Sequence, residues 1–197
     1  MQLRNLTIPY AQPAVFAPMA GFTDASCRHL MADHGAAWTV SEMASAKALN
    51  FGDRKSLELL RDKHPHGLYA VQLFGAEPES MAKAILFIRE KGIQFDILDI
   101  NMGCPVPKVV NNGEGSALLK NPELIADIVK SVSSAISKPL TVKVRIGFEK
   151  EPVDIIDIVK RIEDAGAAAI AVHGRTRQQY YSGTADWETI ARIKEAV

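Results

Sequence analysis

Cys104 is the residue of this chain best placed to do chemistry. It stands in the run Asn101-Met102-Gly103-Cys104-Pro105, at the end of the apolar segment 95–100. A cysteine where a buried strand meets its loop has its backbone fixed by the sheet, and the flanking Gly103 and Pro105 favour a bend that turns the sulfur toward a cleft. Cysteine is equally common as a small buried hydrophobe, so this run alone leaves a structural role open.

Two further segment ends carry residues suited to a flat, polar ligand. Gln72 is the one amide in the apolar run 68–73, and a buried amide needs partners that the edge of a heteroaromatic ring offers. Pro18, Met19 and Ala20 follow the apolar run 14–17, where a turn of mostly small residues lets a ring approach the backbone. An ordinary turn has the same composition, so the turn at residues 18–20 is by itself weaker evidence of a ligand site than Gln72 is.

Lys143 and Arg145 alternate with valine in the run 140–146. The two-residue period of a strand puts both side chains on one face, toward either the interior of a barrel or the surrounding helices. Because an unpaired buried cation is costly, an inward Lys143 must meet an anion or an electron-rich ring. The alternative is a salt bridge with an acid such as Asp99.

His173 follows the last apolar run, 168–172, in Val172-His173-Gly174-Arg175-Thr176-Arg177. A single histidine is usually structural, but one beside a glycine turn and two arginines indicates a site for a polar, phosphorylated ligand. These segment ends predict a ring of functional side chains around one mouth of the fold.

Short apolar runs alternate with helical segments along the chain. The runs are rich in β-branched residues and flanked by Gly or Pro, which predicts strands at 14–17, 38–40, 68–73, 95–100, 140–146 and 168–172. Apolar stripes and capping residues predict helices at 78–89, from Pro122 after the cap Asn121 to about 136, at 152–165 and from about 186.

Six strand–helix units in series predict an α/β fold with a parallel sheet covered by helices. No Gly-rich turn follows the first run, which argues against a dinucleotide-binding fold. A (β/α)8 TIM barrel fits better, with only about six of its eight units present, so residues 1–197 are expected to form one partial barrel domain.

Composition narrows the class of protein. The formal net charge is zero, so any basic surface that binds a nucleic acid must be confined to one part of the molecule. Two cysteines, Cys27 and Cys104, without metal-like spacing, favour a reducing compartment and predict no metal site. No secretory leader and no run of about 18 apolar residues is found, so we expect a cytoplasmic protein that does not cross a membrane.

Five stretches, in order and register, resemble the tRNA-dihydrouridine synthase family, bacterial type. They are Ala-Pro-Met-Ala-Gly (17–21), Val-Gln-Leu-Phe-Gly (71–75), Asp-Ile-Asn-Met-Gly-Cys-Pro (99–105), Lys-Val-Arg (143–145) and Val-His-Gly-Arg-Thr-Arg (172–177). The resemblance runs from about residue 8 to the last residue.

That resemblance implies a flavoprotein oxidoreductase in which FMN, with NADPH as reductant, reduces the C5–C6 bond of uridines in tRNA to dihydrouridine. By motif, the FMN contacts would be Pro18, Met19, Ala20, Gln72, Lys143 and His173. Cys104 would be the active-site acid, and the substrate contacts would be Asn101, Arg145, Arg175 and, to the RNA backbone, Lys108.

Family members continue into two more strand–helix units and a C-terminal helical domain that grips tRNA, both absent from these 197 residues. We therefore expect weak FMN retention and little or no turnover, since barrel phosphate sites follow strands 7 and 8. Two alternatives remain: an FMN barrel acting on a free pyrimidine, of the dihydroorotate or dihydropyrimidine dehydrogenase type, or an inactive truncated fragment that binds RNA or a partner. The sequence does not specify the tRNA position modified or the oligomeric state.

Overall fold

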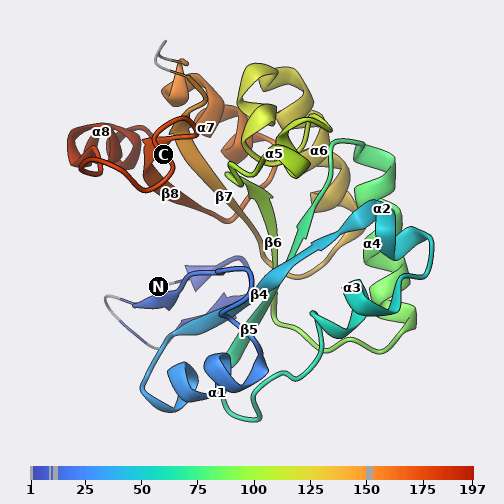
Figure 1. Ribbon diagram of the computed structural model, residues 1–197. Coiled ribbons are helices and arrows are strands. Elements are labelled where there is room, and N and C mark those ends of the chain that lie inside the picture. The colour runs from blue at the N-terminus through green and yellow to red at the C-terminus, as the bar shows by residue number, and fades with distance from the viewer. Residues whose placement is uncertain (1, 9, 11–12, 150–152) are drawn as a thin grey trace.

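Six parallel strands form one curled sheet in the computed structural model, which describes residues 2–8, 10, 13–149 and 153–197. Figure 1 shows the sheet curled like part of a barrel wall, and the fold is a (β/α)8 barrel represented by six of its strands. In spatial order, the strands are β3 (Val15–Phe16), β4 (Trp38–Ser45), β5 (Leu68–Phe74), β6 (Ile97–Met102), β7 (Leu140–Gly147) and β8 (Ala169–Thr176).

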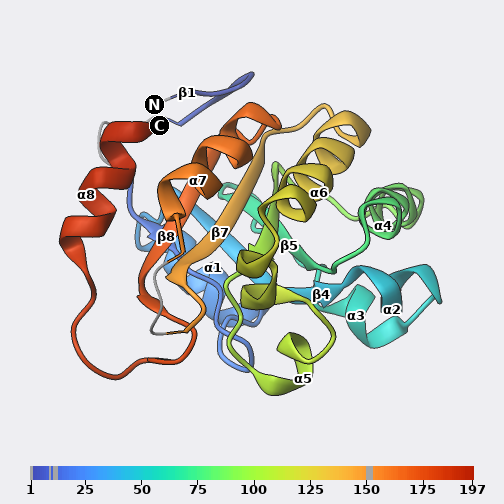
Figure 2. The same cartoon turned by 90° about the horizontal axis from the view of Figure 1, so that it is seen from above.

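Helices cover the outer face of the sheet (Figure 2). The longer ones are α1 (Ala25–Asp33), α4 (Pro78–Glu90), α6 (Pro122–Ala135), α7 (Ile155–Asp164) and α8 (Trp187–Ala196). Short helices α2 (Ala46–Asn50), α3 (Arg54–Glu58), α5 (Pro107–Val110) and the 3₁₀ helix η1 (Gly115–Lys120) lie in the connections after β4 and β6. None of the helices within the described residues is long and apolar enough to span a bilayer.

The predicted elements are confirmed, but β4 and β8 continue five and four residues beyond the predicted ends at 40 and 172. Asn121 caps α6 by accepting the backbone N–H of Leu124 at 3.1 Å, and Asp186 caps α8 in the same way. The expected start of α7 at residue 152 lies outside the described residues, and the described helix begins after Asp154, whose carboxylate accepts the N–H of Asp157.

A β-hairpin that the sequence pattern did not predict closes one end of the barrel interior. β1 (Gln2–Leu3) pairs with β2 (Leu6–Thr7), and Leu3 and Ile8 are each only 1% exposed. They pack with residues from the first halves of the strands, namely Trp38, Val40, Ala70 and Ile97. This apolar plug fills the amino-terminal end of the interior and leaves the carboxyl-terminal end for polar side chains.

Strand register brings the polar residues to the same level of the interior. Gln72 of β5 pairs with Asp99 of β6, and Asn101 of β6 pairs with Lys143 of β7. The alternate residues on these strands belong to the large apolar core between sheet and helices, as Leu98, Ile100, Val142 and Val144 show. The carboxyl halves of β5, β6 and β7 are therefore apolar outward and polar inward.

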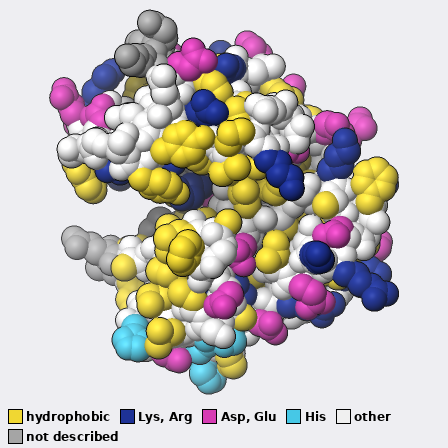
Figure 3. Space-filling model, in the orientation of Figure 1, with side chains coloured by type: hydrophobic (Ala, Val, Ile, Leu, Met, Phe, Trp, Pro, Cys, Tyr) yellow, Lys and Arg dark blue, Asp and Glu magenta, His cyan; other side chains and the backbone are white. Residues whose placement is uncertain are grey.

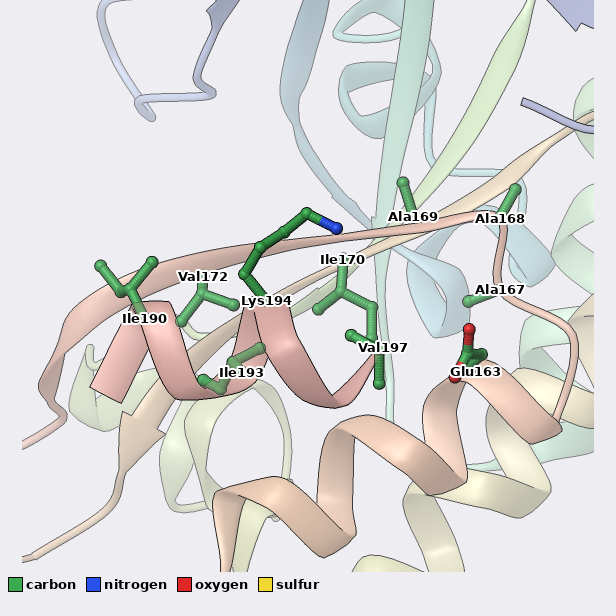
Figure 4. Close-up of a pocket in the computed structure, with 10 residues that line it drawn as sticks. All are labelled: Glu163, Ala167, Ala168, Ala169, Ile170, Val172, Ile190, Ile193, Lys194 and Val197. Carbon is green, nitrogen blue, oxygen red and sulfur yellow. The ribbon is translucent and has the colours of Figure 1, made fainter. Parts of the chain in front are cut away.

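An apolar groove of about 380 Å³ lies on the outer side of the edge strand β8 (Figure 4). Ile170 and Val172 of β8 form one wall, and Ile190 and Ile193 of α8 form the other. Lys194 and Glu163 lie at its rim. The groove lies outside the polar interior that holds the candidate site.

Candidate active site

A hollow of about 710 Å³ opens at the carboxyl-terminal ends of the strands. Figure 3 shows a deep notch in this view, with apolar side chains on both sides. The predicted site residues that line the hollow are Pro18, Met19, Ala20, Gln72, Asn101, Cys104, Lys143, Arg145 and His173. The structure thus brings together residues from five strand ends that are up to 155 positions apart, from Pro18 to His173.

The loop that carries Cys104 is fixed by hydrogen bonds to its backbone. Asn101 Oδ1 accepts the N–H of Cys104 at 2.9 Å and that of Gly103 at 3.2 Å. The Cys104 carbonyl accepts both the backbone N–H and the hydroxyl of Ser116, at 3.1 and 2.8 Å. Because Ser116 is fully buried, these bonds are shielded from water, and the cysteine backbone has little freedom.

Gly115 explains how η1 can approach the cysteine so closely. Its φ of +60° favours glycine, and a Cβ at this position would lie 2.9 Å from the Cys104 carbonyl oxygen and 3.0 Å from Val109 Cγ1. Any side chain at 115 would therefore push the Cys104 loop out of place.

The Cys104 thiol is held in its protonated form. Burial raises its pKa above the ordinary value, against smaller opposing effects of the Val106 backbone N–H and the Arg145 charge. A thiol of this kind is a proton donor at neutral pH and a poor nucleophile. Cys104 is 9% exposed and borders the hollow, so the proton is within reach of a bound ligand.

Below Cys104, a chain of buried polar groups links three strands. Gln72 donates from Nε2 to Asp99 Oδ2 at 2.6 Å, and Asn101 donates from Nδ2 to Gln72 Oε1 at 3.0 Å. Thr141 Oγ1 donates to the other oxygen of Asp99. Burial raises the Asp99 pKa to about 6, against the lowering effects of these bonds and of the Lys143 charge.

Lys143 reaches the hollow as an unpaired cation. No hydrogen bond or ion pair to its ammonium group occurs in the described parts of the chain, so the alternative of a salt bridge with Asp99 is wrong. The Asp99 oxygens are engaged by Gln72 and Thr141 instead. Burial lowers the Lys143 pKa, which the charge of Asp99 partly offsets. A half-buried ammonium without a partner fits an anionic or electron-rich ligand.

Arg145, predicted as a substrate contact, joins two loops of the site. Its Nε donates to the Gly103 carbonyl at 2.9 Å, and its Nη1 donates to the carbonyls of Thr176 and Tyr180 at 3.0 and 2.8 Å. The residue is 3% exposed. The guanidinium therefore ties the Cys104 loop to the segment after β8, and only Nη2 makes no hydrogen bond within the described residues.

His173 is neutral and its tautomer is determined by its neighbour. Burial, followed by the charges of Arg145, Lys143 and Arg175, lowers its pKa to about 4. Arg175 Nη1 lies 3.2 Å from His173 Nε2, and because a guanidinium can only donate, Nε2 is the acceptor and Nδ1 carries the hydrogen. The remaining Arg175 donors hold the carbonyls of Ser182 and Gly183.

Two predicted substrate contacts, Arg175 and Lys108, do not border the hollow as it is described. Arg175 donates a hydrogen bond to His173 and another to the Ser182 carbonyl in the loop before α8. Lys108 is exposed on α5, just beyond the Cys104 loop. Their positions suit contacts with a ligand larger than the hollow.

The turn at residues 18–21 is anchored from both sides. The backbone N–H of Gly21 donates to the carboxylate of Glu42, which follows Ser41 on β4. The hydroxyl of the fully buried Thr23 bonds to both the N–H and the carbonyl of Met19, at 3.1 Å each. The turn is therefore a rigid edge of the site.

Several residues at the rim of the hollow carried no sequence signal of their own. Phe22 and Tyr181 are each 73% exposed, and Tyr180, Met43 and Val106 also line the site. The Tyr181 ring lies 6.0 Å from the His173 ring and 5.6 Å from the Arg145 guanidinium. For the two tyrosines, the adjacent pair Tyr180-Tyr181 shortly after the His173 segment is the one pattern that could have indicated a role in the site.

Comparisons with known proteins place the chain in a family. The family model described as dihydrouridine synthase (Dus) matches residues 15–197. The tRNA-dihydrouridine synthase B of Shewanella oneidensis is 44% identical over 183 residues, covering 93% of this chain and 56% of that protein. Those of Pseudomonas aeruginosa and Xanthomonas campestris pv. campestris are 43% and 41% identical, over 96% and 100% of this chain and 57% and 58% of theirs. The chain thus spans little more than half the length of these relatives, and it belongs to the dihydrouridine synthase family.

Proposed function

We propose that this chain carries the flavin- and uridine-binding site of a tRNA-dihydrouridine synthase, with FMN as cofactor, NADPH as reductant and tRNA as substrate. Family membership and the names of the relatives support the reaction class. The observation that carries the proposal is the protonated Cys104 thiol, fixed at the edge of a hollow that also holds an unpaired lysine and a neutral histidine.

The residues present fit the ring system of FMN. The rigid turn of Pro18, Met19 and Ala20 would lie against the ring, and Gln72 would meet a polar edge. Lys143 supplies the unpaired cation that an anionic reduced flavin needs, and His173 can donate from Nδ1. When bound, the flavin supplies the hydride for C6 of uracil.

Cys104 then supplies the second hydrogen. As hydride reaches C6, negative charge builds at C5 and O4 of uracil, and a nearby thiol can protonate C5. The raised pKa of Cys104 keeps that proton on the sulfur at neutral pH. The thiolate left behind is close to the Arg145 charge, which favours the anion in this step.

Asn101 and the three cations would hold the substrate. The Asn101 amide keeps one unused N–H for a uracil carbonyl, and Arg145 keeps Nη2 for O4 or a phosphate. Arg175 and Lys108 would contact the RNA backbone at the margin of the site. A uridine stacked in folded RNA must swing out to enter, so recognition leans on RNA shape and backbone.

Single-turnover assays test this proposal. The chain, saturated with added FMN and reduced with NADPH, is mixed with tRNA that lacks dihydrouridine, and the nucleosides are analysed by mass spectrometry. We expect a low yield of dihydrouridine in the tRNA, and we expect Cys104→Ala to lower the single-turnover rate by about a hundredfold to ten-thousandfold. Reduction of free uracil or oxidation of dihydroorotate, with the tRNA unchanged, would favour a free-pyrimidine enzyme instead.

A further inference from the structure

Asp99 is the one acid in the chain of buried polar groups beneath Cys104, and it touches neither the hollow nor the cysteine. It lies two positions before Asn101 on β6 and pairs in register with Gln72 of β5 and Thr141 of β7. With 5% exposure, it is shielded from water. Its two oxygens accept from Gln72 and Thr141, so each oxygen has one donor.

The backbone N–H groups of the cysteine loop identify which atom of each amide faces which neighbour. The N–H groups of Gly103 and Cys104 can only donate, so the Asn101 atom that faces them is the oxygen. The Asn101 NH2 group then faces Gln72, whose nearest atom must be its oxygen. The Gln72 NH2 group therefore faces Asp99, and an acceptor is required there.

We propose that Asp99 is a positioning residue that sets the donor–acceptor direction of the Gln72–Asn101 amide pair, and through it fixes the backbone of Cys104. A group without an acceptor at position 99 would leave the NH2 of Gln72, which is 1% exposed, without a partner. Either amide could then turn over, and a reversed Asn101 would present NH2 to the two backbone N–H groups. The hold on the Cys104 loop would be lost.

The same direction sets what the site offers a ligand. Each amide NH2 has two hydrogens and uses one within the buried polar network, so Asn101 and Gln72, which both line the hollow, each keep one N–H for a ligand. The ligand atoms that face them must be acceptors, such as the carbonyl oxygens of a pyrimidine or a flavin. This second consequence rests on the proposed function, whereas the effect on Cys104 does not.

Titration of Asp99 gives an independent test of the proposal. Its pKa of about 6 follows from burial, and the charged group that acts on it is Lys143 of β7, while its bonded neighbours Gln72 and Thr141 are neutral. Protonation would turn one acceptor oxygen into a donor and weaken the bond from Gln72. The side-chain amide resonances of Gln72 and Asn101 should then shift together near that pH.

The experiment compares Asp99→Leu with Asp99→Asn, both in a Cys27→Ser background that leaves Cys104 as the only thiol. Asparagine can offer its carbonyl to Gln72 while its NH2 donates to the Thr141 hydroxyl, whereas leucine has no acceptor. Alkylation of Cys104 by iodoacetamide at pH 7.5 should quicken about tenfold in Asp99→Leu and stay within about twofold of the parent in Asp99→Asn. Neither the alkylation rate nor the amide resonances require flavin or tRNA, so a failure of this proposal can be told apart from a failure of the proposed function.

Val40→Ala is the matched control, because Val40 is a buried member of the apolar plug and its side chain has no polar atom to hydrogen-bond with Gln72, Asp99, Asn101 or Thr141. It should lower the melting temperature and leave the alkylation rate unchanged. If Asp99→Leu does not fold, the amide resonances of the parent decide. A common midpoint near pH 6 that Asp99→Asn abolishes supports the proposal, and amides unmoved by pH, or equal alkylation in Asp99→Leu and the parent, overturn it.

Discussion

Asn101 Oδ1 accepts the backbone N–H of Cys104 at 2.9 Å, so one side chain of the strand end fixes the residue three positions later. The same amide donates to Gln72 and lines the hollow. The loop, the neighbouring strand and the ligand surface are therefore linked through one residue. Substitutions near Asn101 and Cys104 give predictions that test the loop, the neighbouring strand and the ligand surface separately.

Gly115→Ala should be more destabilising than an ordinary glycine substitution. Gly113→Ala is the control: its φ is +76° with open space around it, so backbone strain alone should lower the free energy of unfolding by about 1–2 kcal/mol. At Gly115, the added contact with the Cys104 carbonyl should lower it by about a further 1–3 kcal/mol. Urea denaturation measures both, and equal losses would show that the loop moves freely.

Arg145→Met should free the segments that the guanidinium now joins. Three carbonyl groups, of Gly103, Thr176 and Tyr180, lose their donor, which should lower the free energy of unfolding by about 1–3 kcal/mol. Hydrogen exchange should speed up in residues 103–106 and 176–181. Lys108→Met, at an exposed cation on α5, should leave both unchanged. Normal protection in Arg145→Met would contradict the bridging role.

His173→Gln should gain stability relative to the parent as the pH falls. The native His173 pKa of about 4 lies below the ordinary histidine value of 6.5, so between these values the unfolded chain binds more protons. His173 therefore makes the parent less stable as the pH falls from about 6.5 to 4. The difference between parent and variant in denaturation free energy should follow that window. A difference independent of pH would mean that His173 titrates normally.

Asp99→Asn should change the pH dependence of the free energy of unfolding in the opposite sense. The native Asp99 pKa of about 6 lies above the ordinary aspartate value of 3.8, so the folded chain binds more protons between the two. Asp99 thus makes the parent less stable as the pH rises from about 4 to 6, and the variant should lack this loss. Chemical denaturation at several pH values measures it, and parallel curves for parent and variant would count against a buried, titrating carboxyl.

The sequence predicted the sheet and most of the site because both depend on local patterns. Gln72, Asn101, Lys143 and His173 stand out as polar residues at the ends of apolar runs, and parallel strands end at one edge. The strand at 38–40 was predicted too short, because β4 continues through the polar Ser41 and Glu42 across a bulge to Ser45.

What the sequence could not supply was set by contacts distant in the chain. The acceptors of Arg145 come from residues 103, 176 and 180, which only the folded chain brings together. The salt bridge considered for Asp99 is not found among the described residues, where the Asp99 oxygens accept from Gln72 and Thr141 instead. The hairpin of β1 and β2 has strands of two residues, too short for any periodic pattern.

The state of the Cys104 thiol tests the central claim most directly. Thiolate absorbance in the ultraviolet, followed against pH in the Cys27→Ser variant, reports the pKa of Cys104 alone. We predict a pKa above the ordinary thiol value, as a buried proton donor requires. An apparent pKa below about 7 would mean a thiolate at neutral pH, and the proton for C5 of uracil could not come from Cys104.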